Sequence, residues 1–488
     1  MQAVGLALPR REPYFRRSRI SQKLRAEQMN LFFSYLYNPI PVCSDGTIKG
    51  VRKIENDKTK YMKTIKPRLI VMSFLQFAVW GAYLTSMGSY LSRIGLGEKI
   101  GIFYAMQGIV SIFMPAIMGV IADRYVRAER LLGISHFIAA VAMFLTGYTG
   151  LAAAQAGGVP EFGVMFAFYS VSVAFYMPTI ALSNSVSYSA LTKYGYDTVK
   201  DFPPIRTFGT IGFICAMLLV NFSKSEGISF QDSYMQFFVS AAFGLVLAIY
   251  AFTMPACPVS KNKGSLSFVD VFGLKAFTLF KERRMAIFFV FSMLLGVSLQ
   301  ITNGYGNAFI SSFQGSADPV IAGSWGARNA NALISLSQLS ETLCILMIPF
   351  FLKKFGIKTV MLIAMFAWVL RFALFGAGNP GSGVWMFILS MIVYGVAFDF
   401  YNISGSLFVD KETEPEIRSS AQGLFMLMTN GFGATIGTLG AQAVVNHFVY
   451  RAEVPDWSAA WYIFAAYALV VAVTFALVFR EKKHPSKV

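Results

Sequence analysis

The feature that most constrains this sequence is a series of apolar runs, each about as long as a helix that crosses a bilayer. Such a helix needs roughly 20 residues. Apolar residues make up 55% of the 488 residues and charged residues only 14%, which is typical of an integral membrane protein. The sequence therefore predicts an all-α membrane protein with twelve transmembrane helices. The runs lie at about 69–91, 100–122, 131–151, 163–188, 205–222, 234–254, 285–308, 330–352, 358–377, 384–407, 419–446 and 459–479.

The net charge of +17 is divided unevenly between the loops on the two sides of these helices. Loops on the side shared with Met62 hold 23 Lys and Arg, whereas the opposite loops hold 5. Because basic loops stay in the cytoplasm, we expect both termini to be cytoplasmic. The charge therefore reflects membrane topology and does not indicate binding to nucleic acid. The four cysteines show no spacing of a disulfide framework or zinc site, and no phosphate-binding glycine loop is present, so no cofactor or metal is expected.

The longest internal loop divides the helices into two sets of six. We expect an N-terminal bundle over 62–254, a cytoplasmic loop over 255–284, and a C-terminal bundle with a cytoplasmic tail over 285–488. Residues 1–61 hold twelve basic and five acidic residues and no apolar run of spanning length. We expect this basic extension to be disordered or to lie upstream of the true start of the protein.

Short sequence echoes recur six helices apart, as two parallel repeats of six helices require. The three pairs are Met114-Pro115 with Ile348-Pro349, Val173–Tyr176 with Val396–Asp399, and Ile205-Arg206 with Ile417-Arg418. In such transporters the substrate site lies near the membrane midplane, between the repeats.

Two carboxylates, Glu341 and Asp399, fall well inside the apolar runs. An ionised acid at the bilayer centre costs at least about 2.5–3.5 kcal/mol, so both side chains should face protein or water. Tyr394 and Phe398 share one helical face and place rings beside Asp399. We interpret the acids as proton-exchanging groups of a substrate cavity. The alternative is a structural ion pair with an intramembrane cation, of which Arg371 is the candidate partner of Asp399.

Further polar and aromatic residues recur at helical spacing. After Pro203-Pro204, the residues Arg206, Thr210 and Phe213 share one face, and the pairs Gln300 with Asn303 and Gln338 with Glu341 are each three residues apart. Donors, acceptors and rings together suit a flat polar ligand such as a base joined to a sugar. The alternative is that the amides bind helices together and the rings pack in the core. Gln76 and Trp80 form a weaker stripe, and His136 is expected to be an interface histidine.

These residues also carry a family resemblance. The segment Gly119–Arg124 resembles the loop motif between helices two and three of the major facilitator superfamily. The segments Asp201–Phe213, Leu299–Asn303, Ser337–Leu343 and Ala397–Ser406 resemble the bacterial nucleoside:proton symporters of that superfamily, and the likeness runs from about Ile70 to Phe479.

The resemblance implies two six-helix bundles in a bacterial inner membrane and proton-driven import of nucleosides by alternating access. Asp399 would be the proton-coupling group, with Glu341 and Arg371 as further candidates. The partners would be nucleosides, protons and the lipid bilayer, and we expect the protein to act as a monomer. The nucleoside site would be lined by Arg206, Thr210, Phe213, Gln300, Asn303, Gln338, Glu341, Tyr394, Phe398 and Asp399.

Three other functions stay open on the sequence. One is transport of another small polar solute, such as a sugar, on the same fold. A second is nucleoside facilitation or export, and a remote third is a membrane-embedded enzyme. The sequence offers the enzyme no nucleophile elbow and no metal-ligand cluster.

Overall fold

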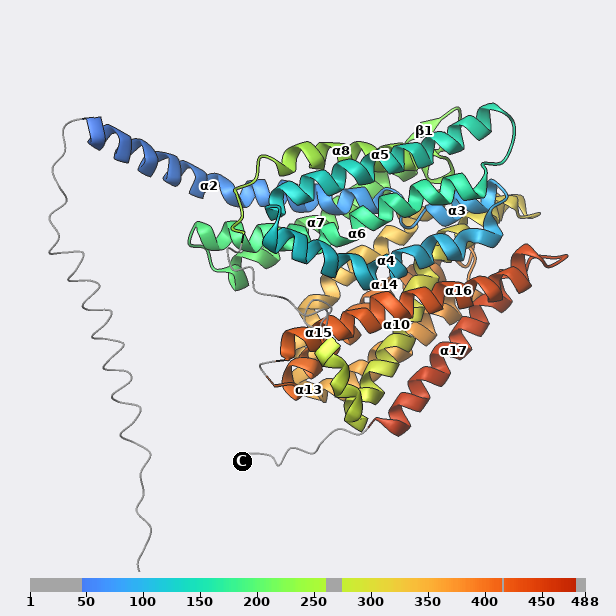
Figure 1. The fold of residues 1–488 in the computed structure, drawn as a ribbon. Coiled ribbons are helices and arrows are strands. Elements are labelled where there is room, and N and C mark those ends of the chain that lie inside the picture. The colour runs from blue at the N-terminus through green and yellow to red at the C-terminus, as the bar shows by residue number, and fades with distance from the viewer. Residues whose placement is uncertain (1–45, 260–273, 415–416, 480–488) are drawn as a thin grey trace, which may run out of the picture. The chain divides into compact units, whose positions relative to one another are not determined.

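A computed structural model describes residues 46–259, 274–414 and 417–479, and almost all of this backbone is helical (Figure 1). The chain divides into two units, Met1–Lys63 and Thr64–Val488, and the description below concerns the second. Of the predicted N-terminal extension, residues 1–45 lie outside the described residues, and residues 46–61 belong to helix α2 (Gly46–Gly81). Residues 260–273 of the predicted loop between the bundles also lie outside them.

Within the described residues, the first half of the chain forms six further helices after α2, of which α3 is short. They are α3 (Met87–Arg93), α4 (Ile100–Arg124), α5 (Ala128–Gln155), α6 (Phe162–Lys193), α7 (Thr198–Phe222) and α8 (Met235–Ala251), with short 3₁₀ turns η1 (Gly97–Lys99) and η2 (Phe230–Asp232). Strands β1 (Lys224–Ser225) and β2 (Ile228–Ser229) pair antiparallel in a short hairpin between α7 and η2.

The second half begins with η3 (Leu274–Lys281) and contains helices of very different lengths. They are α10 (Arg283–Ser312), α11 (Pro319–Ala322), α12 (Trp325–Arg328), α13 (Ala330–Ala377), α14 (Val384–Glu412), α15 (Arg418–Met426), α16 (Ala434–Val445) and α17 (Trp457–Val478). The 3₁₀ turn η4 (Phe313–Gly315) follows α10. The π-helical segments η5 (Leu427–Gly433) and η6 (Asn446–Tyr450) flank α16.

All twelve predicted runs are helical over most of their length, which confirms the predicted fold class. Within the described residues, nine helical segments are long and apolar enough to cross a membrane. One of them, α13, contains two predicted runs, which are separated by a kink at Gly356. The backbone there is non-helical (φ 76°), a conformation that favours glycine. The run 234–254 corresponds to the shorter helix α8, and the run 69–91 to the end of α2 and α3. The side of the membrane on which the termini lie stays a prediction.

The halves meet along helices that approach each other closely. Helix α4 packs on α16, α3 packs on α10, and α7 packs on α13. A Cβ atom added to Gly88 would overlap the carbonyl oxygen of Gly304, and one added to Gly108 would lie 2.9 Å from that of Gly431. Small residues at such crossings let two membrane helices pack backbone to backbone. In Figure 1 the blue and green helices of the first half accordingly lie against the yellow and red helices of the second.

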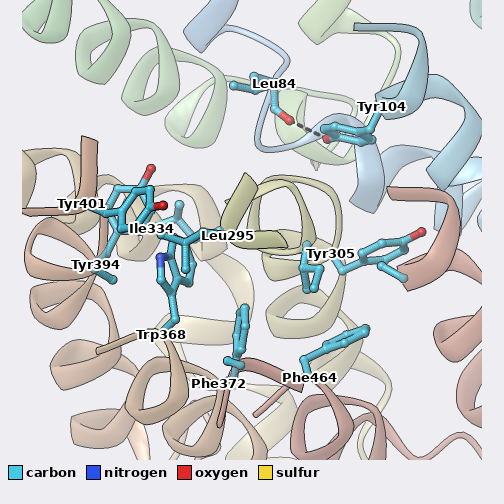
Figure 2. Close-up of a cluster of buried hydrophobic side chains, with 14 of the residues drawn as sticks. Leu84, Tyr104, Leu295, Tyr305, Ile334, Trp368, Phe372, Tyr394, Tyr401 and Phe464 are labelled. Atoms are coloured by element: carbon cyan, nitrogen blue, oxygen red, sulfur yellow. Dashed lines mark hydrogen bonds between the residues drawn. The ribbon is translucent and has the colours of Figure 1, made fainter. Parts of the chain in front are cut away.

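An aromatic cluster supports the second half from within. Trp368 meets the ring of Phe372 at 5.5 Å and the ring of Tyr394 edge-on at 5.9 Å, and all three side chains are buried. Figure 2 shows Trp368 between these two rings. The cluster fixes the part of α14 from which the predicted site residues project.

Candidate functional site

The predicted acids lie on two helices that are packed against each other. Glu341 belongs to α13 and Asp399 to α14, and these helices approach each other closely at Gly395, where a Cβ atom would lie 2.6 Å from the carbonyl oxygen of Ser340. The Ser340 hydroxyl donates a hydrogen bond to the carbonyl of Ile392. Because Ser340 and Gly395 are each close in sequence to an acid, this contact brings the two carboxyl groups within electrostatic reach of each other.

Asp399 is the more secluded of the two acids. Its side chain is 5% exposed, and its Oδ2 atom has no hydrogen-bond partner among the described residues. A buried polar atom without a partner carries a desolvation cost, so such an atom in a native protein calls for a functional explanation. Exchange of a proton or of a substrate contact is such an explanation.

The other half contributes Arg206, from the first part of α7. Its guanidinium lies over the ring of Phe77, 3.8 Å from the centroid, and interacts electrostatically with Glu341 across the boundary between the halves. Gly209 makes room for it, since a Cβ atom there would lie 2.9 Å from Arg206 Nη1. One face of the site is therefore basic and the other acidic.

Aromatic rings come from both halves. Tyr394 and Phe398 of α14 stack nearly parallel, with their centroids 5.7 Å apart and 6° between the planes. In the first half, Phe213 meets Trp80 edge-on at 6.1 Å. Trp80 donates to Gln107 at 3.3 Å, so its indole is held by a hydrogen bond as well as by packing.

The predicted amides divide into two groups. Gln338 lies within hydrogen-bonding reach of the Tyr394 hydroxyl and so belongs with the acids. Gln300 in α10 is buried, and its Oε1 atom has no partner among the described residues, whereas Asn303 is half-buried. Of the predicted residues, the contacts join Arg206, Glu341, Gln338, Tyr394, Phe398 and Asp399 into one group. Thr210, Gln300 and Asn303 are placed on their helices without a recorded contact to that group.

The pairing of Arg371 with Asp399 that the sequence suggested is wrong. Arg371 Nη1 donates to the carbonyl of Ser390 at 2.6 Å and to the Ser337 hydroxyl at 3.4 Å. Ser390 precedes Asp399 by nine residues, which is about 14 Å along a helix. The guanidinium lies beside the ring of Tyr394, 4.6 Å from its centroid, and Asp399 Oδ2 has no partner among the described residues, so the two side chains form no ion pair.

Some contacts of the site have only a weak signal in the sequence. Phe77, which underlies Arg206, is one apolar residue among many in a membrane helix, and only its position three residues before Trp80 singles it out. The stripe residue Gln76 instead holds a neighbouring network. It donates to Thr179 at 2.8 Å and lies 2.8 Å from His136 Nε2, so His136 is a buried interface histidine, as the sequence indicates.

The halves are closed against each other at one end, here termed the outer end, which carries the α7–α8 and α10–α13 connections. Gln231 accepts from the backbone N–H of Asn331 at 3.0 Å and donates to the carbonyl of Arg328 at 3.0 Å. Asn221 donates to Asn329 at 2.8 Å, and Asn307 donates to Gln231 at 3.4 Å. We call Asn221, Gln231, Asn307, Asn329 and Asn331 the amide clasp.

A surface ion pair adds to the closure at the outer end. Arg451, before α17, donates to Glu98 at 2.7 Å, and this bond raises the pKa of Arg451 above its ordinary value. Gln442 of α16 donates to the carbonyl of Gly97 at 3.2 Å. The conformation is therefore one in which the outer end is shut.

A cavity of about 1070 Å³ lies elsewhere. It is lined by the last turns of α6, by Arg127 and by residues 256–259, and no predicted site residue is among its lining. A much smaller cavity of about 20 Å³ adjoins the site, where Phe398 and Asn402 meet Asn430 of η5.

Twelve apolar helical runs in two contacting halves, with two neighbouring acids of which one interacts with an arginine across the boundary, define a secondary transporter of the major facilitator type. Residues 62–484 match the model of a family described as "Nucleoside H+ symporter", and the chain belongs to this family. It is a multi-pass protein of a bacterial inner membrane and a transporter, not an enzyme. The predicted family, fold class and transport function are thereby confirmed.

Two relatives from Escherichia coli (strain K12) are equally similar to the chain. The nucleoside permease NupG is 46% identical over 422 residues, which cover 86% of this chain and 96% of that protein. A xanthosine permease is 46% identical over 428 residues, which cover 87% and 98%.

Solved structures agree with this assignment. The crystal structure of the nucleoside transporter NupG matches with a TM-score of 0.76 and 46% identity, over 86% of this chain and all of that one. An aspartate-to-alanine mutant of the same transporter matches with a TM-score of 0.79 and 45% identity, over 85% of this chain and all of that one.

Proposed function

We propose that this protein imports nucleosides together with protons through a site between its halves, and that Asp399 carries the proton. The observation that supports this most directly is the arrangement of charge inside the membrane. Two acids lie within electrostatic reach of each other on adjoining helices. The half-buried Glu341 also interacts with Arg206 of the opposite half, and the buried Asp399 has an oxygen without a partner among the described residues. Intramembrane ionisable groups with this placement are typical of proton relays in transporters.

The side chains present suit the two parts of a nucleoside. Hydroxyl groups of a sugar can donate to Glu341 and accept from Arg206 or Gln338, and the unpartnered Gln300 Oε1 is an acceptor for an exocyclic amine of a base. The parallel rings of Tyr394 and Phe398 offer a flat surface against which a base can pack. Thr210, Phe213 and Asn303 complete the proposed lining.

The proposed coupling follows from the cost of moving a buried charge. Protonation of Asp399 removes one negative charge from the site. The halves can then rock around a bound nucleoside without enclosing an uncompensated carboxylate. Loss of the proton to the opposite side then restores the charge and resets the carrier. The electrostatic contact between Arg206 and Glu341 spans the boundary between the halves. The binding of a nucleoside between these two residues therefore depends on how the halves are positioned relative to each other.

Opening of the outer end requires the amide clasp to separate, since its hydrogen bonds join the first half to the second. The proposed site is built within one chain. We propose that one copy is sufficient for transport, with no bound cofactor, and that the proton gradient supplies the energy.

The test is uptake of labelled uridine or adenosine by proteoliposomes with an imposed pH gradient. We expect accumulation above the external concentration, its loss when a protonophore dissipates the gradient, and competition by other nucleosides. Free ribose and free base should compete weakly, because each contacts only part of the site. Uptake that does not depend on the pH gradient, or competition by free ribose as strong as that by nucleosides, would reject the proposal.

A further inference from the structure

We propose that Arg371 is a positioning residue that holds the Tyr394 ring in the orientation needed to bind substrate. The inference rests on the proposed nucleoside site and adds to it a residue that lies behind the site and contacts the substrate only through Tyr394.

The burial of Arg371 is unusual for an arginine. Its side chain is 1% exposed, in the second part of α13, within a membrane-spanning region. A buried guanidinium needs compensation for the water it has lost, and arginine stays protonated in proteins. The contacts that supply this compensation therefore indicate what the residue does.

These contacts connect the two segments that carry the proposed site. Arg371 Nη1 donates to the Ser390 carbonyl at 2.6 Å, one helical turn before Tyr394 in α14. It also donates at 3.4 Å to the hydroxyl of Ser337, the residue before Gln338. In return, the Ser390 hydroxyl donates to the carbonyl of Arg371 at 3.1 Å. One side chain thus joins α14 to the first part of α13.

The guanidinium also contacts the ring of Tyr394 directly. Its central carbon lies 4.6 Å from the ring centroid, and a second ring, that of Phe375, lies at 5.1 Å. Attraction between a cation and an aromatic face is strongest where water is excluded, as it is here. The two aromatic rings thereby stabilise the buried charge of Arg371 in part, as a carboxylate would do in an ion pair.

Tyr394 is held from its other sides by residues already described. Phe398 stacks on it at 5.7 Å, and Trp368 meets it edge-on at 5.9 Å. The hydroxyl of Tyr394 reaches Gln338. Arg371 is the member of this set that contributes both a hydrogen bond to the backbone one turn before the ring and a charge against the ring. Its removal should free Tyr394 to change its side-chain rotamer.

The experiment measures nucleoside uptake by the purified full-length protein in proteoliposomes as a function of nucleoside concentration. We compare wild type, Arg371→Gln, Arg371→Lys, Tyr394→Ala and the double variant Arg371→Gln/Tyr394→Ala. Arg283→Gln, which alters an exposed arginine at the start of α10, is the matched control. The amount of folded protein is set equal by size-exclusion chromatography before reconstitution.

Arg371→Gln should raise the KM for uptake about tenfold, while the maximal rate per folded molecule changes much less. Arg371→Lys should recover only part of the loss, since lysine keeps the charge but lacks the planar guanidinium. In the Tyr394→Ala background, Arg371→Gln should raise the KM no further, because the ring on which it acts is gone.

Two results would overturn the inference. One is an unchanged KM in both single Arg371 variants, with any loss confined to the maximal rate, which is the signature of a structural role alone. The other is a full additional KM increase in the double variant, which would show that Arg371 acts independently of Tyr394. If wild type itself fails to transport nucleosides, the proposed function fails instead, and the two failures are distinguishable.

Discussion

Replacing Gln231 with leucine should weaken the amide clasp and shift the protein toward a conformation that is open at the outer end. The Gln231 side chain makes three hydrogen bonds to the second half, with the Arg328 carbonyl, the Asn331 N–H and the Asn307 amide. Side-chain hydrogen bonds in membrane proteins contribute on average about 0.6 kcal/mol each. Together the three contribute about 2 kcal/mol, which corresponds to a shift of about 30-fold in the equilibrium between closed and open states.

The assay is a distance measurement between spin labels on the two halves by double electron–electron resonance. Suitable positions are the exposed residues Glu226, in the hairpin before η2, and Val320 in α11, in a variant that lacks the native cysteines. We expect Gln231→Leu to add a longer-distance population that is minor in the parent. Gln155→Leu, at the exposed end of α5, is the control. An unchanged distance distribution in Gln231→Leu would refute the assignment of the clasp as the element that closes this end.

Three further predictions concern the site and its frame. Gly395→Val should force α13 and α14 apart, since a Cβ atom would lie 2.6 Å from the Ser340 carbonyl. We expect the free energy of unfolding to fall by about 1–3 kcal/mol, which would lower the melting temperature in detergent, and we expect the nucleoside KM to rise. Arg206→Lys should raise the KM about tenfold in uptake assays, because lysine cannot stack flat on Phe77 as the guanidinium does at 3.8 Å, and an unchanged KM would argue against its role in binding. Arg451→Gln should change transport less than about twofold, since an exposed ion pair contributes at most about 1 kcal/mol, and a larger loss would assign this pair a greater share of the closure.

The helices could be predicted from the sequence because the bilayer imposes a length on them. Every backbone polar group in lipid needs a hydrogen-bond partner within the protein, and a long apolar run meets this need by forming a helix. Breaks in the runs were harder to predict. The run 69–91 is interrupted between Gly81 and Met87, and the two runs of α13 are nearly continuous around Gly356, since tertiary packing decides such details.

The acids of the site could be found because charge is rare and costly inside the membrane. Glu341 and Asp399 stand out for that reason alone. Helical periodicity then predicts that Tyr394 and Phe398 lie on the same part of the helix as Asp399. The partner of Arg371 could not be predicted in the same way. Opposite charge suggests Asp399, whereas the guanidinium in fact donates to the backbone carbonyl of Ser390 and lies against the ring of Tyr394. The amide clasp could not be predicted either, because its members come from α7, η2, α10 and the start of α13, which are separated in sequence.

The measurement that tests the central claim most directly is proton-driven uptake by Asp399→Asn, compared with wild type in the same proteoliposomes. Asparagine keeps the size and polarity of the side chain but cannot release a proton. We predict that the variant still exchanges labelled for unlabelled nucleoside across the membrane, while it neither accumulates nucleoside against its gradient nor moves protons when nucleoside is added. Full concentrative uptake by Asp399→Asn, with a normal nucleoside-dependent proton flux, would contradict the account.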